Sequence, residues 1–223
     1  MTVTVEEQET CLLATVDDGK ANALSSEVIV RLRAALADAV ATGRGLVVAG
    51  RDGSFCAGFD LAVMRSGDRQ AIAALLTEGE RLFMEMLQAP VAVAVACTGH
   101  ALAGGALLLL SADWRVGRPG PYQLGLNEVR IGMALPEFAV GLVRHRLPVR
   151  HHTAATMAAE ITEPARAVEI GFLDALADDP VAAACRWVEG VAANDQRAFA
   201  VTKRRLRRTL VETLAAINQP SSV

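Results

Sequence analysis

Short apolar runs alternate with amphipathic stretches over the first 130 residues. The apolar runs predict strands at 2–6, 11–16, 46–50, 91–97 and 113–116. Apolar residues at helical spacing predict a helix that begins at Ser25-Ser26, and further helices at 69–88 and 104–112. From Pro136 onward every segment is predicted to be helical, and the last helix is the basic one around 202–214. This pattern predicts an α/β fold with a buried, largely parallel sheet.

The change of pattern predicts two parts of the chain. Residues 1–145 form a core of strands and helices, and residues 146–223 form a helical C-terminal region. The length of 223 residues fits one domain, or one domain with an appendage. The expected role of the helical region is to cap the core or to mediate assembly.

One stretch has the composition of a membrane span. Residues 86–112 contain no Asp, Glu, Lys or Arg, and a window of about 19 such residues marks a candidate transmembrane helix. The β-branched run that starts at Pro90 favours a buried strand instead. Thr98-Gly99-His100 then interrupts the run, and Gly104-Gly105 opens a second apolar element. We therefore expect two buried elements and no membrane partner.

Composition narrows the functional classes. Hydrophobic residues make up 52 % of the chain, the net charge is −3 and the mean hydropathy is +0.30, so disorder and a basic nucleic-acid binder are excluded. The cysteines Cys11, Cys56, Cys97 and Cys185 form no C-x-x-C pair and have no histidine at metal-ligand spacing. We expect unpaired thiols and no metal. The N-terminal segment does not resemble a signal peptide, which favours a cytoplasmic protein.

Three segments are candidates for chemistry. They are 54–61, 99–106 and 125–132, and each contains glycine or other small residues. Small residues allow a ligand to approach the backbone, and two converging N–H groups stabilise an oxyanion. Glu128 lies among apolar residues, which raises the pKa of a carboxyl and suits it to proton transfer. Tight turns with an exposed glutamate are the alternative. Dinucleotide, P-loop and nucleophile-elbow motifs are absent from the sequence.

Taken together, these segments resemble the crotonase, or enoyl-CoA hydratase/isomerase, superfamily. The segments that carry the resemblance are Ala21-Asn22-Ala23-Leu24-Ser25, Phe55-Cys56-Ala57-Gly58-Phe59-Asp60, Gly99 to Gly105, Thr162 to Asp174 and Thr202-Lys203. The resemblance implies a spiral of ββα units with a helical C-terminal region that packs in trimers, often paired into hexamers. It also implies an acyl-CoA thioester substrate. Coenzyme A is then part of the substrate, and no separate cofactor is expected.

The resemblance also assigns roles to residues. The backbone N–H groups of Phe59 and Gly104 match the pair that holds the thioester oxygen. Glu128 matches a catalytic glutamate. The expected substrate-binding positions are Ala23, Leu24, Ala57, Asp60, Leu61, Gly105 and Leu107. Among them, Asp60 is expected to fix its loop and not to react.

Leu107 occupies the position at which the hydratases carry a second glutamate. A leucine cannot orient or deprotonate water, whereas moving a double bond needs one base and the exclusion of water. The segment around Glu128 also resembles that of Δ3,Δ2-enoyl-CoA isomerases. We therefore expect an isomerase with Glu128 as the proton shuttle. The alternatives are a hydratase or another crotonase-type reaction, and an acyl-CoA binding protein without turnover.

Glu137 and the arginines of the last predicted helix each have two possible roles. Glu137 follows Pro136, so it is either a second acid or a residue that complements a helix dipole. Arg204, Arg205, Arg207 and Arg208 either form a solvated helix face or meet CoA phosphates. Lys203 matches a basic position of the family, which suggests a contact with CoA.

Overall fold

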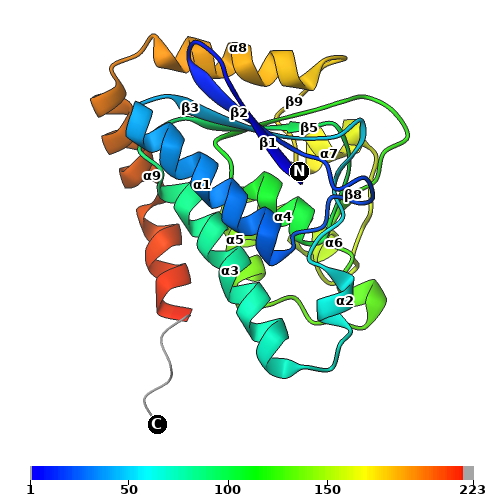
Figure 1. The fold of residues 1–223 in the computed structure, drawn as a ribbon. Helices are drawn as coiled ribbons and strands as arrows, with labels where there is room; N and C mark the ends of the chain where they lie inside the picture. The colour runs from blue at the N-terminus through cyan, green and yellow to red at the C-terminus, as the bar shows by residue number, and fades with distance from the viewer. Residues whose placement is uncertain (1, 218–223) are drawn as a thin grey trace.

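The computed structural model describes residues 2–217 and contains two sheets (Figure 1). The larger sheet has the strand order β1-β2-β3-β5-β7-β9, and β1 is its antiparallel member. Its strands are β1 (Val3–Glu7), β2 (Cys11–Val16), β3 (Gly45–Gly50), β5 (Val93–Cys97), β7 (Trp114–Gly117) and β9 (Ala175–Leu176). The smaller, parallel sheet consists of β4 (Gly53–Cys56), β6 (Gly99–Leu102) and β8 (Leu124–Gly125).

After α1, three successive pairs of strands each pass from the larger sheet to the smaller one before the next helical element. β3 and β4 lead to α2 (Leu61–Met64) and α3 (Arg69–Gln88), and β5 and β6 lead to α4 (Gly104–Leu110). β7 and β8 lead to the 3-10 turn η1 (Val129–Ile131) and to α5 (Glu137–Arg146). This is the expected spiral of ββα units, and the expected α/β class is confirmed.

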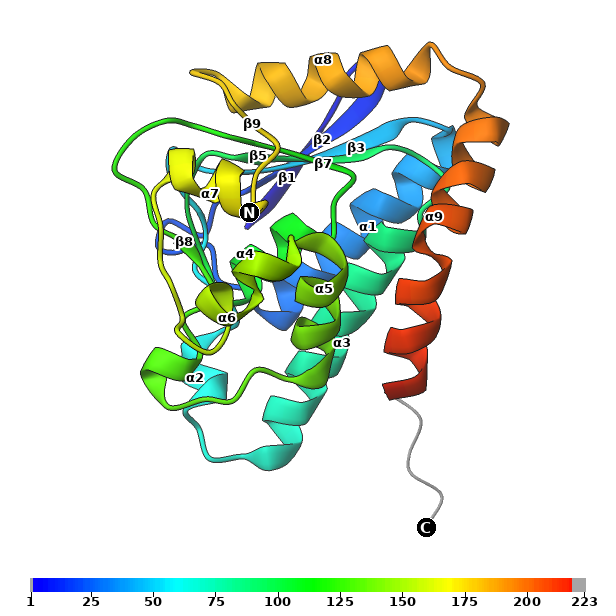
Figure 2. The same cartoon turned by 180° about the vertical axis from the view of Figure 1, so that it is seen from behind.

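The helices cover both faces of the larger sheet (Figures 1 and 2). α8 (Pro180–Ala192) lies on one face, where it packs on a cluster that includes Cys11, Val47 and Ala94. The other face carries the larger core, to which α1 (Ser26–Thr42), α3 and α4 contribute. The remaining helical elements are η2 (Val149–His151), α6 (His152–Ala155), α7 (Pro164–Ile170) and α9 (Gln196–Ile217).

Local signals explain where α1 begins and ends. The Ser25 side chain accepts a hydrogen bond from Val28 N, and Gly43 adopts the left-handed conformation at the C-terminus with φ of 67°. Ile29, Leu32 and Leu36 are buried as the spacing predicts. Val40 follows Leu36 at helical spacing, so the apolar pattern also predicts its burial, but it lies near the end of the helix and is 39 % exposed.

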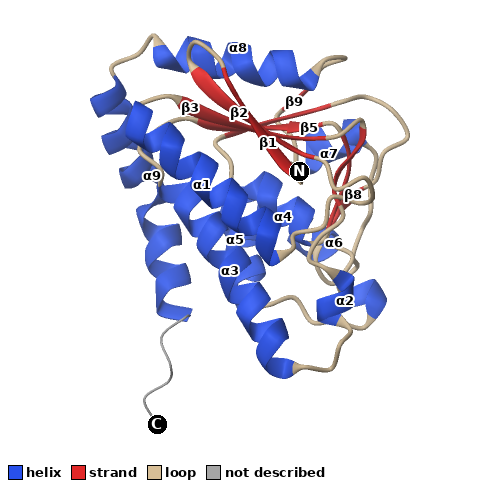
Figure 3. Ribbon diagram, viewed as in Figure 1, coloured by secondary structure: helices blue, strands red, loops and turns tan. Residues whose placement is uncertain are grey.

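The smaller sheet was not predicted. The sequence favours a loop over residues 51–60 and a turn between the strand at 91–97 and the helix at 104–112, yet these segments contain β4 and β6. β9 likewise contradicts the expectation that every segment after Pro136 is helical (Figure 3). These strands have two or four residues, too few for an alternating pattern to emerge. Their pairing depends on neighbours that are distant in the sequence.

The C-terminal residues build part of the core. α8 covers the sheet, β9 pairs with β7, and Leu210 and Leu214 of α9 are buried. The expected boundary between residues 145 and 146 falls inside α5. No helix among residues 2–217 is long and apolar enough to cross a membrane.

A buried ion cluster attaches α9 to the sheet. Lys203 Nζ donates to Asp113 Oδ2 at 2.6 Å and to Val91 O at 3.0 Å. Arg207 Nη2 donates to Asp113 Oδ1 at 2.8 Å. The suggested contact of Lys203 with CoA is therefore wrong, because its ammonium is enclosed within the fold. The solvated-face interpretation is also wrong for Arg207, which is buried, but Arg204, Arg205 and Arg208 are exposed.

Candidate active site

A cavity of about 220 Å³ lies where the three candidate segments meet. Its predicted lining residues are Ala57, Phe59, Leu61, Leu107 and Glu128. Its other lining residues are Met64, Arg65, Leu76, Ala103, Asn127, Ile131, Met133, Ala134 and Pro136. Most of these side chains are apolar, so the cavity suits an apolar chain with a reacting group beside Glu128.

In the loop before α2, the Phe59 N–H points away from the neighbouring segment at Leu24. Leu24 N donates to Gly58 O at 2.8 Å, and Asp60 N donates to Leu24 O at 3.3 Å. These two bonds bracket Phe59, so alternation along the extended backbone directs Phe59 N to the opposite side. Within residues 2–217, Phe59 N donates no hydrogen bond.

Gly104, the first residue of α4, lies against the Phe59 loop. A Cβ built on Gly104 would lie 3.1 Å from Phe59 Cδ2, and one built on Gly58 would lie 3.3 Å from Gly104 N. As the first residue of a helix, Gly104 has no intrahelical acceptor for its N–H, and Gly104 N donates no backbone hydrogen bond within the described part of the chain. The structure thus brings two free backbone donors into adjoining segments.

Ala103 immediately precedes this donor in an unusual backbone conformation. Its φ is 49° and its ψ is −121°, a region that a residue with a Cβ rarely adopts. Ala103 N donates to Gly125 O at 3.0 Å, and Ala103 O accepts from Ala106 N and Leu107 N. The strain is therefore held by the bonds that begin α4 and join β6 to the segment before Glu128.

Glu128 is the carboxylate of the cavity. It precedes η1 and is 7 % exposed, and its Oε2 is buried with no hydrogen-bond partner among the described residues. Burial raises the pKa of Glu128, and a hydrogen bond from its own backbone partly opposes that rise. A carboxyl with a raised pKa both accepts and returns a proton more readily near neutral pH.

Leu107 gives the cavity an apolar wall. It lies on α4 and is 2 % exposed. No second carboxylate lines this cavity among the described residues. The arrangement therefore provides one base in an enclosed apolar space, which suits a proton transfer between two carbons of one substrate.

The remaining predicted positions are not among the residues that line this cavity; they are Ala23, Leu24, Asp60, Gly104 and Gly105. Leu24 is 1 % exposed and fixes the Phe59 loop through its backbone. The Asp60 carboxylate accepts from Ala62 N at 2.8 Å and caps α2, which agrees with the expectation that it fixes its loop. A Cβ on Gly105 would lie 2.1 Å from Cys56 O, so this glycine permits close packing of α4 on β4. Ala23 N donates to Asp18 Oδ2 at 3.2 Å, within the segment that connects β2 to Leu24.

Glu137 lies outside this cavity. It is exposed in the first turn of α5 and lines a separate cavity of about 620 Å³, together with Arg144, His145 and Thr209. Pro136, one residue earlier, still lines the Glu128 cavity. This placement favours the helix-dipole role for Glu137 over the role of a second acid.

Several lining residues were missed from the sequence. Met64 and Arg65 lie within four residues of the end of the 54–61 segment, and Asn127 precedes Glu128, so proximity to a motif was a usable signal for them. Leu76 carries no such signal, because only the packing of α3 brings it to the cavity. No cluster of His, Cys, Asp or Glu that would hold a metal occurs within the described residues.

Comparison with known proteins places this geometry in a family. Residues 6–220 match the family model for enoyl-CoA hydratase/isomerase. An enoyl-CoA hydratase/isomerase family protein from Pseudomonas syringae is similar in structure, with 35 % identity, a TM-score of 0.94, and coverage of 97 % of this chain and 94 % of that one.

Two curated relatives carry different activity names. The human mitochondrial enoyl-CoA delta isomerase 1 is 28 % identical over 59 % of this chain and 44 % of its own length, so less than half of that protein is matched. A probable enoyl-CoA hydratase of Mycobacterium tuberculosis, EchA14, is 26 % identical over 91 % of this chain and 80 % of its own length. The family model covers nearly the whole chain, and the protein therefore belongs to the enoyl-CoA hydratase/isomerase family.

Proposed function

We propose that this protein is an enoyl-CoA isomerase that converts a 3-enoyl-CoA into a 2-enoyl-CoA. The observation that carries the proposal is the buried Glu128 carboxylate in a cavity where Leu107 stands in place of a second carboxylate. A single base is sufficient for isomerisation, whereas efficient hydration also needs a group that holds water. The similarity to an isomerase supports this proposal, although a hydratase is matched as well.

In the proposed reaction Glu128 carries one proton between two carbons. Glu128 removes a proton from C2, and the C3=C4 double bond becomes part of a dienolate. Glu128 then returns the proton to C4, which leaves the double bond between C2 and C3. Glu128 ends the cycle as a carboxylate, so no co-reactant is consumed. The wall formed by Leu107 keeps bulk water from the intermediate.

The backbone donors stabilise the dienolate in this proposal. The thioester oxygen would accept hydrogen bonds from Phe59 N and Gly104 N, the two free donors of adjoining segments. Such preorganised donors are worth about 10²–10³ in rate where one has been removed. The coenzyme A part of the substrate would pass the loop of Ala23 and Leu24. By family resemblance the enzyme would act as a homotrimer or hexamer in the cytoplasm, without a further cofactor.

A hydratase is the second candidate, because the chain resembles EchA14 over most of its length. A paired assay distinguishes the two. Purified protein receives a 3-enoyl-CoA in one sample and a 2-enoyl-CoA in the other, with absorbance of the conjugated thioester and product mass as readouts. The proposal predicts growing conjugation in the first sample and at most slow gain of water in the second. Rapid hydration with no isomerisation would contradict it, and no turnover in either sample would favour a binding protein.

A further inference from the structure

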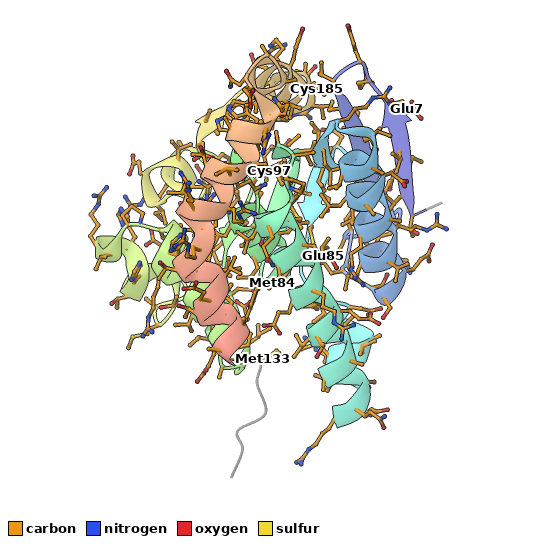
Figure 4. The ribbon with its side chains drawn as sticks, turned by 90° about the vertical axis from the view of Figure 1, so that its left-hand side faces the viewer. Glu7, Met84, Glu85, Cys97, Met133 and Cys185 are labelled. Atoms are coloured by element: carbon orange, nitrogen blue, oxygen red, sulfur yellow. The ribbon has the colours of Figure 1, made fainter. Side chains whose placement is uncertain are left out.

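Two cysteines lie at the interface between α8 and the larger sheet. Cys11 is the first residue of β2, is fully buried and belongs to the cluster that α8 covers. Cys185 lies on α8 (Figure 4), is partly exposed and packs against the same cluster. Neither residue lines the Glu128 cavity, so the candidate active site leaves both thiols without a role.

The register of the sheet places Cys11 beside the position that α8 covers. Cys11 is the register partner of Gly45 on β3, and neighbouring strands lie about 4.8 Å apart. A Cβ built on Gly45 would lie 2.3 Å from Val188 Cγ1, so Val188 sits directly over Gly45. Cys185 precedes Val188 by three residues, so the two share one face of α8 and are about 4.5 Å apart along its axis. The step along the helix therefore matches the step between the two strands.

The two thiols interact directly. A hydrogen bond from the Cys11 thiol lowers the pKa of Cys185 to about 7, although burial and Asp179 oppose this effect and Arg186 adds to it. The same hydrogen bond, together with burial and the charge of Cys185, raises the pKa of Cys11. An accessible thiolate beside a second thiol is the arrangement of redox-sensitive cysteines.

We propose that Cys185 and Cys11 form a reversible oxidation site, in which a peroxide converts the two thiols into a disulfide that joins α8 to β2. Cys185 is the attacking thiol, because it is partly exposed, and Cys11 is the resolving thiol, because it is enclosed. The inference is independent of the proposed isomerase reaction, since it uses none of the residues assigned to that reaction.

The reaction is balanced with the peroxide as the oxidant. The Cys185 thiolate bonds to one peroxide oxygen, the O–O bond breaks and hydroxide leaves, which produces a sulfenic acid. The Cys11 sulfur then bonds to the Cys185 sulfur as the S–O bond breaks, and the Cys11 proton leaves with the departing oxygen as water. The two sulfurs lose the two electrons that the peroxide oxygens gain. An external dithiol restores both thiols and becomes a disulfide itself.

The first step also prepares the second one. Oxidation of Cys185 removes the thiolate whose hydrogen bond and charge help to raise the pKa of Cys11. The resolving thiol therefore ionises more readily once the sulfenic acid has formed. Because a thiolate is the attacking form in disulfide chemistry, closure should follow the first oxidation and protect Cys185 from further oxidation.

The other two cysteines provide an internal comparison. Cys56 and Cys97 are both buried, and burial raises the pKa of each to about 12. Cys56 also lies close enough to Cys97 to contribute to that rise. Neither carries a thiolate near neutral pH, so proximity alone does not make this second pair an oxidation site.

The test treats purified protein with hydrogen peroxide and then alkylates the remaining thiols after denaturation. Intact mass should show two alkyl groups fewer than in the untreated protein, and a dithiol should restore them. Peptide mapping without reduction should recover one linked pair, Cys11 with Cys185. The Tm of the oxidised protein should rise by about 4 °C or more, because the disulfide closes a long loop of the unfolded chain.

Two variants distinguish the attacking pair from the other thiols. In Cys11→Ala the linked peptide should be absent, and Cys185 should instead gain oxygen atoms, because no thiol remains to resolve the sulfenic acid. Cys97→Ala is the matched control, since it also removes a buried thiol, and it should form the Cys11–Cys185 link as the wild type does. Cys185→Ser, at a partly exposed position, should form no link.

Several results would overturn the proposal. They are four unmodified thiols after peroxide treatment, a link between Cys56 and Cys97, a link between two molecules, and oxidation of Cys185 without a link in the wild type. A fall in Tm on oxidation would also overturn it, because the bond would then pull α8 away from its position on the sheet. The Cys11–Cys185 link in wild type and Cys97→Ala, with its loss in Cys11→Ala, supports the site.

Discussion

The Phe59 ring rests on Gly79 of α3, where a Cβ would lie 2.3 Å from Phe59 Cε1. The same ring faces Phe83 at 6.3 Å between centroids, one turn further along α3. Because Gly79 has no side chain, the surface of α3 leaves room there for the Phe59 ring. This packing of the Phe59 ring on Gly79 matters because Phe59 N is a proposed oxyanion donor. The ring fixes the position of the loop to which Phe59 N belongs.

Gly79→Ala should displace this ring. We expect kcat/KM for 3-enoyl-CoA to fall about 10-fold or more, because small displacements of positioning groups have effects of this size or larger. Gly190→Ala on α8 is the control, since no atom lies within 4 Å of its added Cβ. That variant should keep activity and gain about 0.5–1 kcal/mol of stability. Full activity of Gly79→Ala would show that the packing of the ring on Gly79 does not position Phe59.

Glu128→Gln should stabilise the protein at neutral pH. The folded pKa of Glu128 is raised by burial, so the folded state favours the protonated form. The contribution of Glu128 to the free energy of unfolding is fully present below the pKa that this group has in the unfolded chain. It is lost as the pH rises through the pKa of the folded state. The gain in Tm of Glu128→Gln over wild type should therefore be near zero at acidic pH and positive at pH 8. A gain that grows on acidification would contradict burial as the cause of the raised pKa.

The Asp113 cluster should be a large source of stability for α9. Asp113→Asn leaves Lys203 and Arg207 buried without a counter-charge, and breaking a buried pair in this way costs about 3–5 kcal/mol. Urea unfolding measures the loss. Glu169→Gln is the matched control, because its ion pair with Arg166 is exposed and such pairs contribute about 0–1 kcal/mol. Equal effects of the two variants would refute the structural role of the cluster.

Cys185 should be the reactive thiol of the chain. It lies on α8 (Figure 4), and a hydrogen bond from Cys11 lowers its pKa to about 7. The same contact raises the pKa of Cys11, and burial raises the pKa of Cys56 and Cys97 to about 12. Alkylation by iodoacetamide at pH 7.5 should show one fast phase, because the thiolate is the nucleophile.

Peptide mapping identifies the thiol that reacts in this fast phase. Cys185→Ser should abolish the phase, and its rate in the wild type should rise with pH around 7 as Cys185 ionises. A fast phase that persists in Cys185→Ser, or that maps to a fully buried thiol, would contradict this assignment.

Long periodic elements were predictable from the sequence, and short ones were not. The stripe of Leu75, Leu82 and Leu87 correctly predicts α3 over 69–88, because each added turn repeats the pattern. β6 and β9 exist only through pairing with strands far along the chain. Lys203 and Arg207 show the same limit, since only the position of Asp113 explains how two cations are buried.

Some residues of the candidate site could be found from the sequence, and the placement of others required the fold. Phe59, Leu107 and Glu128 came from motif resemblance, and they do line one cavity. The separation of Glu137 from that cavity needed the direction of α5. The sequence likewise does not reveal that Asn127 Oδ1 is buried without a hydrogen-bond partner among the described residues, because burial depends on the fold.

If Glu128 alone carries the proton, replacing it should remove turnover, whereas replacing Glu137 should not. The kcat/KM for a 3-enoyl-CoA is measured for wild type, Glu128→Gln and Glu137→Gln. Loss of the base should lower kcat/KM by at least about 100-fold in Glu128→Gln. Glu137→Gln should remain close to wild type, because Glu137 lines a different cavity. Unchanged turnover in Glu128→Gln, or a large loss confined to Glu137→Gln, would show that Glu128 is not the proton shuttle.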